Sequence, residues 1–341
     1  MEQVSIWFLK NRRAFPWREG KTPYSVLISE VMLQQTRALA VIPYFEKWMK
    51  RFPNFQALSQ ATESEVVKMW EGLGYYSRVR NLLELAKTIE REYEGKLPDQ
   101  LEELLKLKGI GHYTAGAILS FGFYQKAVAL DGNVERVVSR VIGFEKEVKK
   151  HSKELRQIVF DLLPEKEPYV AMEGLIELGA TICTKKPVCN LCPLHKSCVA
   201  YKQGSQEMLP ILPERKSITP LFRFVACIVC DDHYLVREGE KGRVMAGLYE
   251  FPYLDTDEDF VLSENQKLLQ EALTLPLQLI SPLLKQKQHF TRFKASLFPF
   301  HFSTLQKIPV LGYTWIHKSD LSNHPFSSGH LRILNYLKEL F

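Results

Sequence analysis

The hydrophobic pattern of the chain changes once, across a proline-containing segment at residues 201–219, and this change constrains the fold most. Upstream, apolar residues recur every three to four positions between Pro or Gly breaks, which predicts consecutive amphipathic helices. Downstream, short aromatic and β-branched runs predict strands. A chain of 341 residues has the length of about two domains. The sequence therefore predicts a multi-domain protein with an all-α domain at 1–200, a linker at 201–219 and an α+β domain at 220–341.

The expected elements follow from these two patterns. In the first domain, helices are predicted at 25–40, 63–71, 78–93, 99–107, 114–123, 134–142, 152–162 and 168–180. In the second domain, strands are predicted within 222–230, 234–238, 248–254, 290–302 and 310–316, and helices at 262–273 and 329–339.

The net charge of +6 lies entirely upstream of residue 220, since residues 220–341 contain thirteen Lys plus Arg and thirteen Asp plus Glu. A basic surface attracts phosphate by releasing its counterions, so the first domain is the candidate for nucleic-acid binding. No apolar run is long enough to span a membrane, and the N-terminal segment has no secretory pattern. We therefore expect a cytoplasmic protein without a membrane partner.

Four of the six cysteines crowd into one segment with the spacing C-x5-C-x2-C-x5-C: Cys183, Cys189, Cys192 and Cys198. In a reducing compartment such a cluster indicates metal binding rather than disulfides. Four thiolates within sixteen residues can hold an iron–sulfur cluster or a zinc ion, and the spacing alone does not decide between them. The other two, Cys227 and Cys230, fall on opposite faces of a predicted strand and are expected in the core.

The segment LKLKGIGHYTAGAI, residues 105–118, predicts a tight hairpin between two helices. Gly109 and Gly111 permit the turn, and bare N–H groups at the start of the next helix can meet a phosphate. This arrangement favours a helix-hairpin-helix, at about 98–123, that binds the DNA backbone without reading sequence. An ordinary helix turn is the alternative.

Two acidic residues stand in otherwise apolar or uncharged surroundings, Glu30 in SVLISEVMLQQT and Asp131 in AVALDGNV. Each alone could be a solvated carboxylate or a helix N-cap. Together they suit cleavage of a glycosidic bond, in which one acid protonates the leaving group and the other sustains a sugar cation. The N-glycosidic bond between a base and its sugar is such a bond.

Several motifs, taken in chain order, resemble those of MutY-type adenine DNA glycosylases: ISEVMLQQT, GLGYYSRVRNL, LKGIGHYTAGAI, LDGNVERVVSR, IELGATIC and the cysteine loop. The resemblance spans nearly the whole chain. It implies a helix-hairpin-helix glycosylase domain with a [4Fe-4S] cluster on the four cysteines, and a C-terminal domain similar to MutT (Nudix) hydrolases. It also implies removal of adenine mispaired with 8-oxoguanine or guanine in double-stranded DNA. We expect a monomer that acts at the bacterial nucleoid.

The resemblance also implies catalytic roles. Glu30 resembles the acid that protonates adenine N7 and then handles the water. Asp131 resembles the carboxylate that stabilises the sugar cation, and Asn133 resembles a support for that chemistry. Tyr113 stands where the related endonuclease III family has a nucleophilic lysine. Without an amine there, no Schiff base forms at that position, so we expect hydrolysis without efficient strand cleavage.

Binding roles are implied in the same way. Five residues resemble the walls and hydrogen-bonding groups of the adenine pocket, with plain core packing as the alternative: Arg13, Trp17, Arg18, Leu33 and Glu173. Three others resemble residues inserted into the duplex beside the lesion pair: Gln35, Thr36 and Tyr75.

Two motifs depart from the family pattern. The first cysteine pair is C-x5-C where the family usually has C-x6-C, so the loop is one residue short. The family's F-S-H motif for 8-oxoguanine appears as Phe290-Thr291-Arg292, in which Thr291 keeps a hydroxyl group and Arg292 could contact a phosphate or a base. The MutT-like domain also lacks a glutamate-rich magnesium box, since GRVMAGLYEFP contains only Glu250, so we expect recognition of the damaged strand rather than nucleotide hydrolysis.

Two alternative functions remain open. One is an endonuclease III-like glycosylase/lyase for oxidised pyrimidines, which the tyrosine at position 113 disfavours. The other is a catalytically silent mismatch-binding protein, which the short cysteine loop and the altered lesion motif make conceivable.

Overall fold

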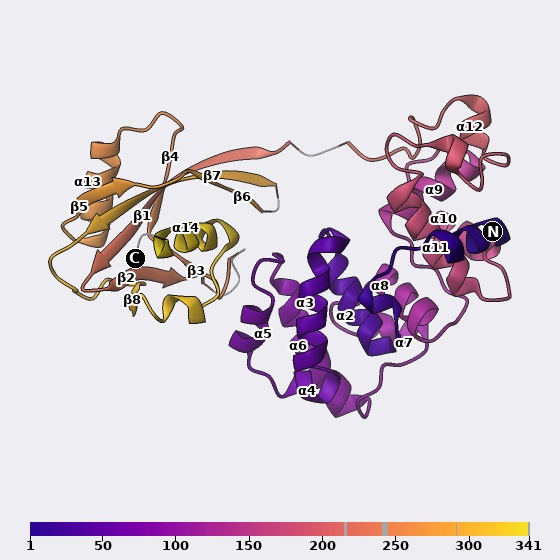
Figure 1. Ribbon diagram of the computed structural model, residues 1–341, viewed down its shortest axis with the longest axis horizontal. Coiled ribbons are helices and arrows are strands. Elements are labelled where there is room, and N and C mark those ends of the chain that lie inside the picture. The colour runs from indigo at the N-terminus through magenta and orange to yellow at the C-terminus, as the bar shows by residue number, and fades with distance from the viewer. Residues whose placement is uncertain (215–216, 241–244, 291, 340–341) are drawn as a thin grey trace. The chain divides into compact units, whose positions relative to one another are not determined.

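Figure 1 shows the computed structural model, which describes residues 1–214, 217–240, 245–290 and 292–339. The chain forms two compact units. The first contains residues 1–61 and 77–214, and the second contains residues 62–76 and 215–341. In the described part of the chain, no helix has the length and apolar character that crossing a membrane requires.

The first unit is helical (Figure 1). Its helices are α1 (Glu2–Asn11), α2 (Pro23–Leu33), α3 (Ala38–Arg51), α4 (Phe55–Ser59), α6 (Ser77–Glu92), α7 (Leu101–Lys106), α8 (His112–Ala117), α9 (Gly132–Ile142), α10 (Ser152–Leu162), α11 (Pro168–Thr181) and α12 (Val199–Gln203). The helix α5 (Glu63–Met69) belongs to the second unit.

Two helices, α2 and α11, have buried residues almost all round and so form much of the core of the first unit. The start of α2 is well specified, because Thr22 and Ser25 exchange side-chain and backbone hydrogen bonds in a capping box and Pro23 occupies the first helical position. Both helices carry buried carboxylates, Glu30 on α2 and Glu173 on α11. Buried carboxylates are rare unless paired or functional.

The single helix expected at 25–40 is wrong, because α2 ends at Leu33 and α3 begins at Ala38. Between them Gln35 has a left-handed backbone with φ of 59°, which stops the helix. The segment contains neither Gly nor Pro, so the sequence carries no ordinary stop signal there. The helices α1, α4 and α12 and most of α3 also lie outside the predicted set, whereas the remaining predicted helices match the observed ones closely.

The first part of the expected linker packs against the helical unit. The helix α12 extends to Gln203, Arg140 donates a hydrogen bond to the carbonyl of Leu209 at 2.9 Å, and the N–H of Val148 donates to the carbonyl of Ile211 at 3.1 Å. The backbone of this stretch therefore has partners on α9 and on the segment after it.

The second unit contains a mixed sheet and two longer helices (Figure 1). Its strands and longer helices are β1 (Thr219–Cys230), β2 (His233–Glu238), β3 (Tyr249–Glu250), β4 (Tyr253–Thr256), β5 (Gln278–Pro282), β6 (Gln286–Phe290), β7 (Phe293–Ser303), β8 (Thr314–His317), α13 (Leu262–Leu273) and α14 (Ser328–Lys338). The strand order is β3-β2-β1-β7-β5, with β4 on β1, β6 on β7 and β8 on β2. Only the central pair, β1 and β7, is parallel among these pairs of described strands.

The helices α14 and α13 cover opposite faces of the sheet of the second unit. Alternate residues of β1 point to opposite faces and so pack with different helices. Val225 and Cys227 pack with α14, whereas Phe224 and Ala226 pack with α13. The expected α+β architecture is confirmed. The run predicted as one strand at 290–302 is divided between the end of β6 and β7, which pair as antiparallel neighbours.

Candidate active site

A cavity of about 930 Å³ opens in the helical unit. Its walls come from the segment 13–18, the end of α2 with the loop to α3, α8, the start of α9, and α11. It brings together all the candidate catalytic and adenine-pocket residues and two of the three candidate duplex-inserting residues: Glu30, Tyr113, Asp131, Asn133, Arg13, Trp17, Arg18, Leu33, Glu173, Gln35 and Thr36. Segments far apart in the sequence therefore supply one site.

Glu30 lies on α2 and is only 8% exposed. Burial, which penalises the charged form, raises the pKa of Glu30 to about 7. A hydrogen bond from Tyr113 opposes this shift, and the negative charges of Asp131 and Glu173 add to it. A carboxyl group with this pKa is about half protonated at neutral pH and is suited to general-acid chemistry.

Tyr113 orients the Glu30 carboxyl group. Its phenol donates a hydrogen bond to Glu30 Oε2 at 2.5 Å. Burial, together with the charges of Glu30 and Asp131, raises the pKa of Tyr113 well above its ordinary value, so the phenol keeps its proton. Because Tyr113 lies on α8, the helix that follows the hairpin, this contact joins the hairpin helix to α2.

Asp131 is the N-cap of α9. Its carboxylate accepts hydrogen bonds from the N–H of Asn133 at 2.9 Å, the N–H of Val134 at 2.8 Å and Asn133 Nδ2 at 2.7 Å. Burial raises the pKa of Asp131, but these hydrogen bonds and the charge of Arg136 favour the ionised form and limit the shift. The N-cap alternative is thus correct, and the same carboxylate also lines the cavity.

Asn133 is held from two sides. The helix α11 comes so close that a Cβ atom on Gly179 would lie 2.6 Å from Asn133 Cβ. The guanidinium of Arg136 donates to Asn133 Oδ1 at 2.8 Å, to the carbonyl of Gly179 at 2.7 Å and to the carbonyl of Cys183 at 2.7 Å. One side chain therefore connects the cavity to the start of the cysteine loop.

Trp17 and Phe15 form an aromatic wall of the cavity. Their rings stack with centroids 4.8 Å apart, and Trp17 meets Phe45 edge-on at 5.7 Å. Trp17 is only 7% exposed, so the core-packing alternative holds for most of its surface. The same flat apolar wall is suited to a planar base.

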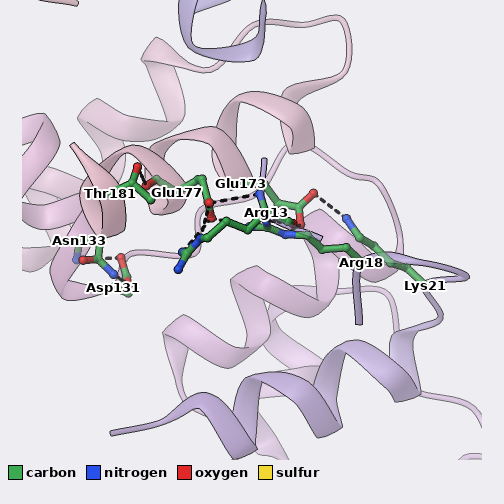
Figure 2. Close-up of polar contacts among 8 residues, drawn as sticks. All are labelled: Arg13, Arg18, Lys21, Asp131, Asn133, Glu173, Glu177 and Thr181. Carbon is green, nitrogen blue, oxygen red and sulfur yellow. Dashed lines mark hydrogen bonds and ion pairs between the residues drawn. The ribbon is translucent and has the colours of Figure 1, made fainter. Parts of the chain in front are cut away.

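Figure 2 shows two carboxylates of α11 facing three cations from the segment 13–21. Glu177 accepts hydrogen bonds from Arg13 Nε at 2.6 Å and from Arg18 Nη2 at 2.8 Å, and Glu173 accepts from Lys21 Nζ at 2.6 Å. Burial raises the pKa of Glu177, but the hydrogen bonds from Arg13 and Arg18 outweigh it and leave the pKa below its ordinary value. Two arginines of the cavity are therefore fixed in place by charge-assisted bonds.

Sequence reasoning missed several residues of this site, including Glu177 and Lys21 in the network and Leu39 on the cavity wall. Glu177 carried a usable signal, because it lies four residues after Glu173 and so on the same face of α11. Lys21 lies in an irregular segment, where no periodicity indicates the direction of its side chain.

The four cysteines line one small second cavity of the helical unit. Arg140, only 3% exposed on α9, donates to Cys183 Sγ at 3.4 Å and to the carbonyls of Thr184 and Leu209. Negative charge beside a buried guanidinium stabilises it, and metal-bound thiolates would supply such charge at Cys183. Four thiols around one cavity with a buried cation at its edge therefore fit a metal–thiolate group such as an iron–sulfur cluster.

The hairpin lies between α7 and α8. Gly109 has φ of 89°, which favours glycine, and Gly111 is the N-cap of α8.

In the loop between α2 and α3, Gln35 is exposed and Thr36 is half-buried, and both line the active-site cavity.

The remaining candidate DNA-binding residues lie in the second unit. Tyr75, in the segment 62–76, is 46% exposed and has φ of 49°. Phe290 ends β6, with its ring 5.6 Å from that of Phe293. Thr291 lies outside the described residues.

Comparison with known proteins identifies the family. The family model that describes HhH-GPD superfamily base excision DNA repair proteins matches residues 28–164 of this chain. The chain is 36% identical over 255 residues to the adenine DNA glycosylase of Buchnera aphidicola subsp. Schizaphis graminum (strain Sg), which covers 73% of each chain. It is 40% identical over 215 residues to the adenine DNA glycosylase of Homo sapiens, which covers 60% of this chain and 39% of the relative.

Among solved structures, a thermostable thymine-DNA glycosylase has a TM-score of 0.56 and 30% identity, covering 59% of this chain and 94% of its own. A non-covalent endonuclease III–DNA complex has a TM-score of 0.52 and 24% identity, covering 60% and 94%, and this likeness concerns the fold alone. The fold and these matches define the class as helix-hairpin-helix base excision DNA repair proteins. Within that class, the chain belongs to the adenine DNA glycosylase family.

Proposed function

We propose that this protein is a monofunctional glycosylase that hydrolyses the N-glycosidic bond of adenine mispaired with 8-oxoguanine or guanine in double-stranded DNA. One observation carries the proposal: Glu30, with a pKa raised to about 7, and Asp131, held by three hydrogen bonds, line the same cavity. Two carboxyl groups in different environments suit acid-assisted glycoside cleavage. Membership of the adenine DNA glycosylase family supports adenine as the base.

In the proposed mechanism Glu30 is the general acid. Protonated Glu30 transfers its proton to N7 of the everted adenine, and the C1′–N9 bond breaks with its electron pair leaving on the base. The hydrogen bond from Tyr113 keeps the carboxyl group in one orientation during this step. The burial that raises the pKa of Glu30 keeps part of the enzyme protonated at neutral pH.

Asp131 would stabilise the sugar cation that remains. Its ionised carboxylate, held by Asn133 and the start of α9, is fixed before the substrate enters, which lowers the cost of reorganisation in the transition state. Water then adds to C1′, and the Glu30 carboxylate takes its proton. The products are free adenine and an abasic site.

The adenine pocket would combine the aromatic wall at Trp17 with Leu33 and the polar groups of Arg13, Arg18 and Glu173. An extruded base needs flat apolar faces and hydrogen-bonding partners at its edges. The ion pairs on α11 keep these polar groups in place without the base.

The hairpin would hold the DNA backbone through the N–H groups at Gly109–Gly111, and Gln35 and Thr36 would fill the space left by the base. Tyr75, in the second unit, would also insert into the duplex. In the second unit, Phe290 and Thr291 would contact the lesion strand. We propose domain limits of 1–200 for the glycosylase domain, 201–219 for the linker and 220–341 for a MutT-like domain that recognises the lesion. The enzyme would work as a monomer at the bacterial nucleoid, where its substrate lies.

The four cysteines would hold a [4Fe-4S] cluster. The cavity that they line and the buried charge of Arg140 support this assignment. When bound, such a cluster would order the loop from Cys183 to Cys198 and place its basic residues against phosphate. Arg136, which is hydrogen-bonded to both Cys183 and Asn133, would then hold Asn133 in a fixed position relative to the ordered loop.

The test is adenine release under single-turnover conditions from duplexes with adenine opposite 8-oxoguanine, guanine or thymine. We expect release opposite 8-oxoguanine and guanine and little opposite thymine. Glu30→Gln should bind the duplex without releasing adenine, while Glu102→Gln, at an exposed site on α7, should behave as wild type. Full activity of Glu30→Gln, or binding without release by the wild type, would contradict the proposal.

The lyase alternative has its own readout. Borohydride traps a Schiff base formed between an enzyme amine and the abasic sugar. Because Tyr113 offers no amine, we expect no covalent complex, and efficient trapping would favour the endonuclease III-like function instead.

A further inference from the structure

One helix, α6, contacts two of the loops of the first unit that the proposed function assigns to DNA, the Gln34–Thr36 loop and the hairpin. Arg78 lies against the end of α2 and the Gln34–Thr36 loop, and Asn81, one turn later, lies against the hairpin. A Cβ atom on Gly109 would be 3.1 Å from Asn81 Cβ. A small cavity lined by Gln34, Arg78, Asn81 and Gly109 separates the two loops. The helix α6 therefore sets the spacing between the Gln34–Thr36 loop and the hairpin.

Arg78 makes the firmer of these contacts. Its side chain is buried, and Nη1 donates hydrogen bonds to the carbonyls of Val31 at 2.6 Å, Met32 at 3.3 Å and Gln34 at 2.7 Å. These carbonyl groups belong to the C-terminal end of α2, where helical partners run out. A cation is also favoured there by the helix dipole. Arg78 thus caps α2 from a different helix.

The loop that follows needs such support. Gln35 has φ of 59°, a conformation that is unfavourable for a residue with a Cβ atom and persists only where surrounding contacts impose it. The N–H of Thr36 closes the turn on the carbonyl of Leu33 at 3.2 Å. The hydrogen bonds from Arg78 to the carbonyls of Met32 and Gln34 hold the backbone on both sides of Leu33. They therefore hold the peptide group between Gln34 and Gln35, from which the loop continues.

We propose that Arg78 is a positioning residue that holds the Gln34–Thr36 loop in the conformation that enters the duplex as adenine leaves it. This inference rests on the proposed function. Arg78 does not line the active-site cavity, so it acts through Gln35 rather than on the base or the sugar. Its loss should therefore slow eversion of the base more than cleavage of the bond.

Eversion and cleavage can be separated by the choice of substrate. An adenine opposite 8-oxoguanine must be unpaired and unstacked, whereas an adenine opposite a tetrahydrofuran abasic analogue has no partner to lose and is easier to extrude. A defect in loop positioning should affect the first substrate more. A defect in Glu30, which lies near the same end of α2, should slow both substrates equally.

The experiment measures single-turnover adenine release from both duplexes by the wild type, Arg78→Met, Arg78→Lys and the control Lys87→Met. Lys87 is exposed on the same helix, so the control removes one cation from α6 without touching the loop. We expect Arg78→Met to lose about tenfold more activity on the 8-oxoguanine duplex than on the abasic duplex. Arg78→Lys should recover part of that loss, and Lys87→Met should match the wild type.

The outcomes are distinguishable. Equal slowing on both duplexes, or no slowing on either, would overturn the assignment of Arg78. If circular dichroism shows that Arg78→Met is unfolded, Arg78→Lys carries the comparison, and the same equal or absent effect would overturn the assignment. A wild type that releases adenine from neither duplex would instead refute the proposed function.

Discussion

Asn133 and Cys183 are joined through a single side chain, because the guanidinium of Arg136 donates hydrogen bonds to both. The side chain of Asn133 in turn donates to Asp131. The carboxylate proposed to face the sugar cation and the first cysteine of the loop therefore share one hydrogen-bonded chain.

This chain predicts the effect of Arg136→Met. The variant keeps the length of the side chain but loses its hydrogen bonds, so Asn133 should no longer be held and adenine release should fall by about tenfold or more. Single-turnover rates and iron content per chain check this, with Lys153→Met, at an exposed site on α10, as the control. Wild-type rates in Arg136→Met would mean that the hydrogen bonds from Arg136 to Asn133 and Cys183 have no catalytic role.

The pKa of Glu30 predicts a pH dependence. If protonated Glu30 is the acid, single-turnover release should fall as pH rises above about 7. The hydrogen bond from Tyr113 lowers the pKa of Glu30, so Tyr113→Phe should move this alkaline limb to higher pH. Rates measured from pH 5 to 9 check both statements. An alkaline limb that stays in place in Tyr113→Phe would separate Tyr113 from the titration of Glu30.

Burial of Glu30 also predicts a stability effect. Its pKa rises from an ordinary 4.5 to about 7 on folding, so the folded state binds the proton more tightly and stability falls as pH rises between these values. Glu30→Gln removes this penalty and should be more stable than the wild type at pH 8 by about 1 to 3 kcal/mol, with a smaller difference at pH 5. Urea unfolding at both pH values measures it. A less stable variant at pH 8 would show that Glu30 is better solvated than its burial indicates.

Capping and chemistry at Asp131 can be separated. Asp131→Ser keeps an N-cap oxygen for α9 but removes the carboxylate, so we expect about wild-type stability with adenine release lowered at least a hundredfold. Asp131→Ala should lose activity and also about 1 kcal/mol of stability. Thermal unfolding beside single-turnover assays distinguishes the two losses. An active Asp131→Ser would reduce Asp131 to a structural cap.

Glu177 is predicted to hold the arginines of the cavity. Glu177→Gln leaves Arg13 and Arg18 facing a neutral group, which should lower stability by about 2 to 4 kcal/mol at pH 7. Because its pKa is lowered on folding, the stability that Glu177 contributes is present above the ordinary pKa and is lost in acid, so the two proteins should converge at low pH. Glu165→Gln breaks the exposed ion pair with Lys126 and should change stability by less than about 0.5 kcal/mol. Equal effects of the two variants would contradict the burial argument.

Most of the helices of the first unit could be predicted because their apolar periodicity is local information. The break at Gln35 could not, because the group that caps α2 is Arg78, far along the chain, and the conformation of Gln35 is imposed by tertiary contacts rather than by its own preference. The prediction of one strand at 290–302 was wrong for a similar reason. Periodicity alone does not reveal that β6 ends and β7 begins within this run.

The candidate site divides in the same way. Family resemblance indicated Glu30, Tyr113 and Asp131, and the structure brings them to one cavity. It did not indicate that Arg136 connects Asn133 to Cys183, because that bond depends on where α11 ends relative to α9. Charges that pair across more than a hundred residues, as Arg18 and Glu177 do, leave no periodic trace in a single sequence.

The contact between Gly179 and Asn133 limits how far this protein can vary. Even a methyl group at position 179 would collide with the backbone and Cβ of Asn133, at 3.0 Å and 2.6 Å. The three nearest atoms that such a group would meet all belong to Asn133. We expect a larger residue at position 179 to push α9 and α11 apart at this point, and a crystal structure of Gly179→Ala would show Asn133 displaced from its contacts with Asp131 and Arg136.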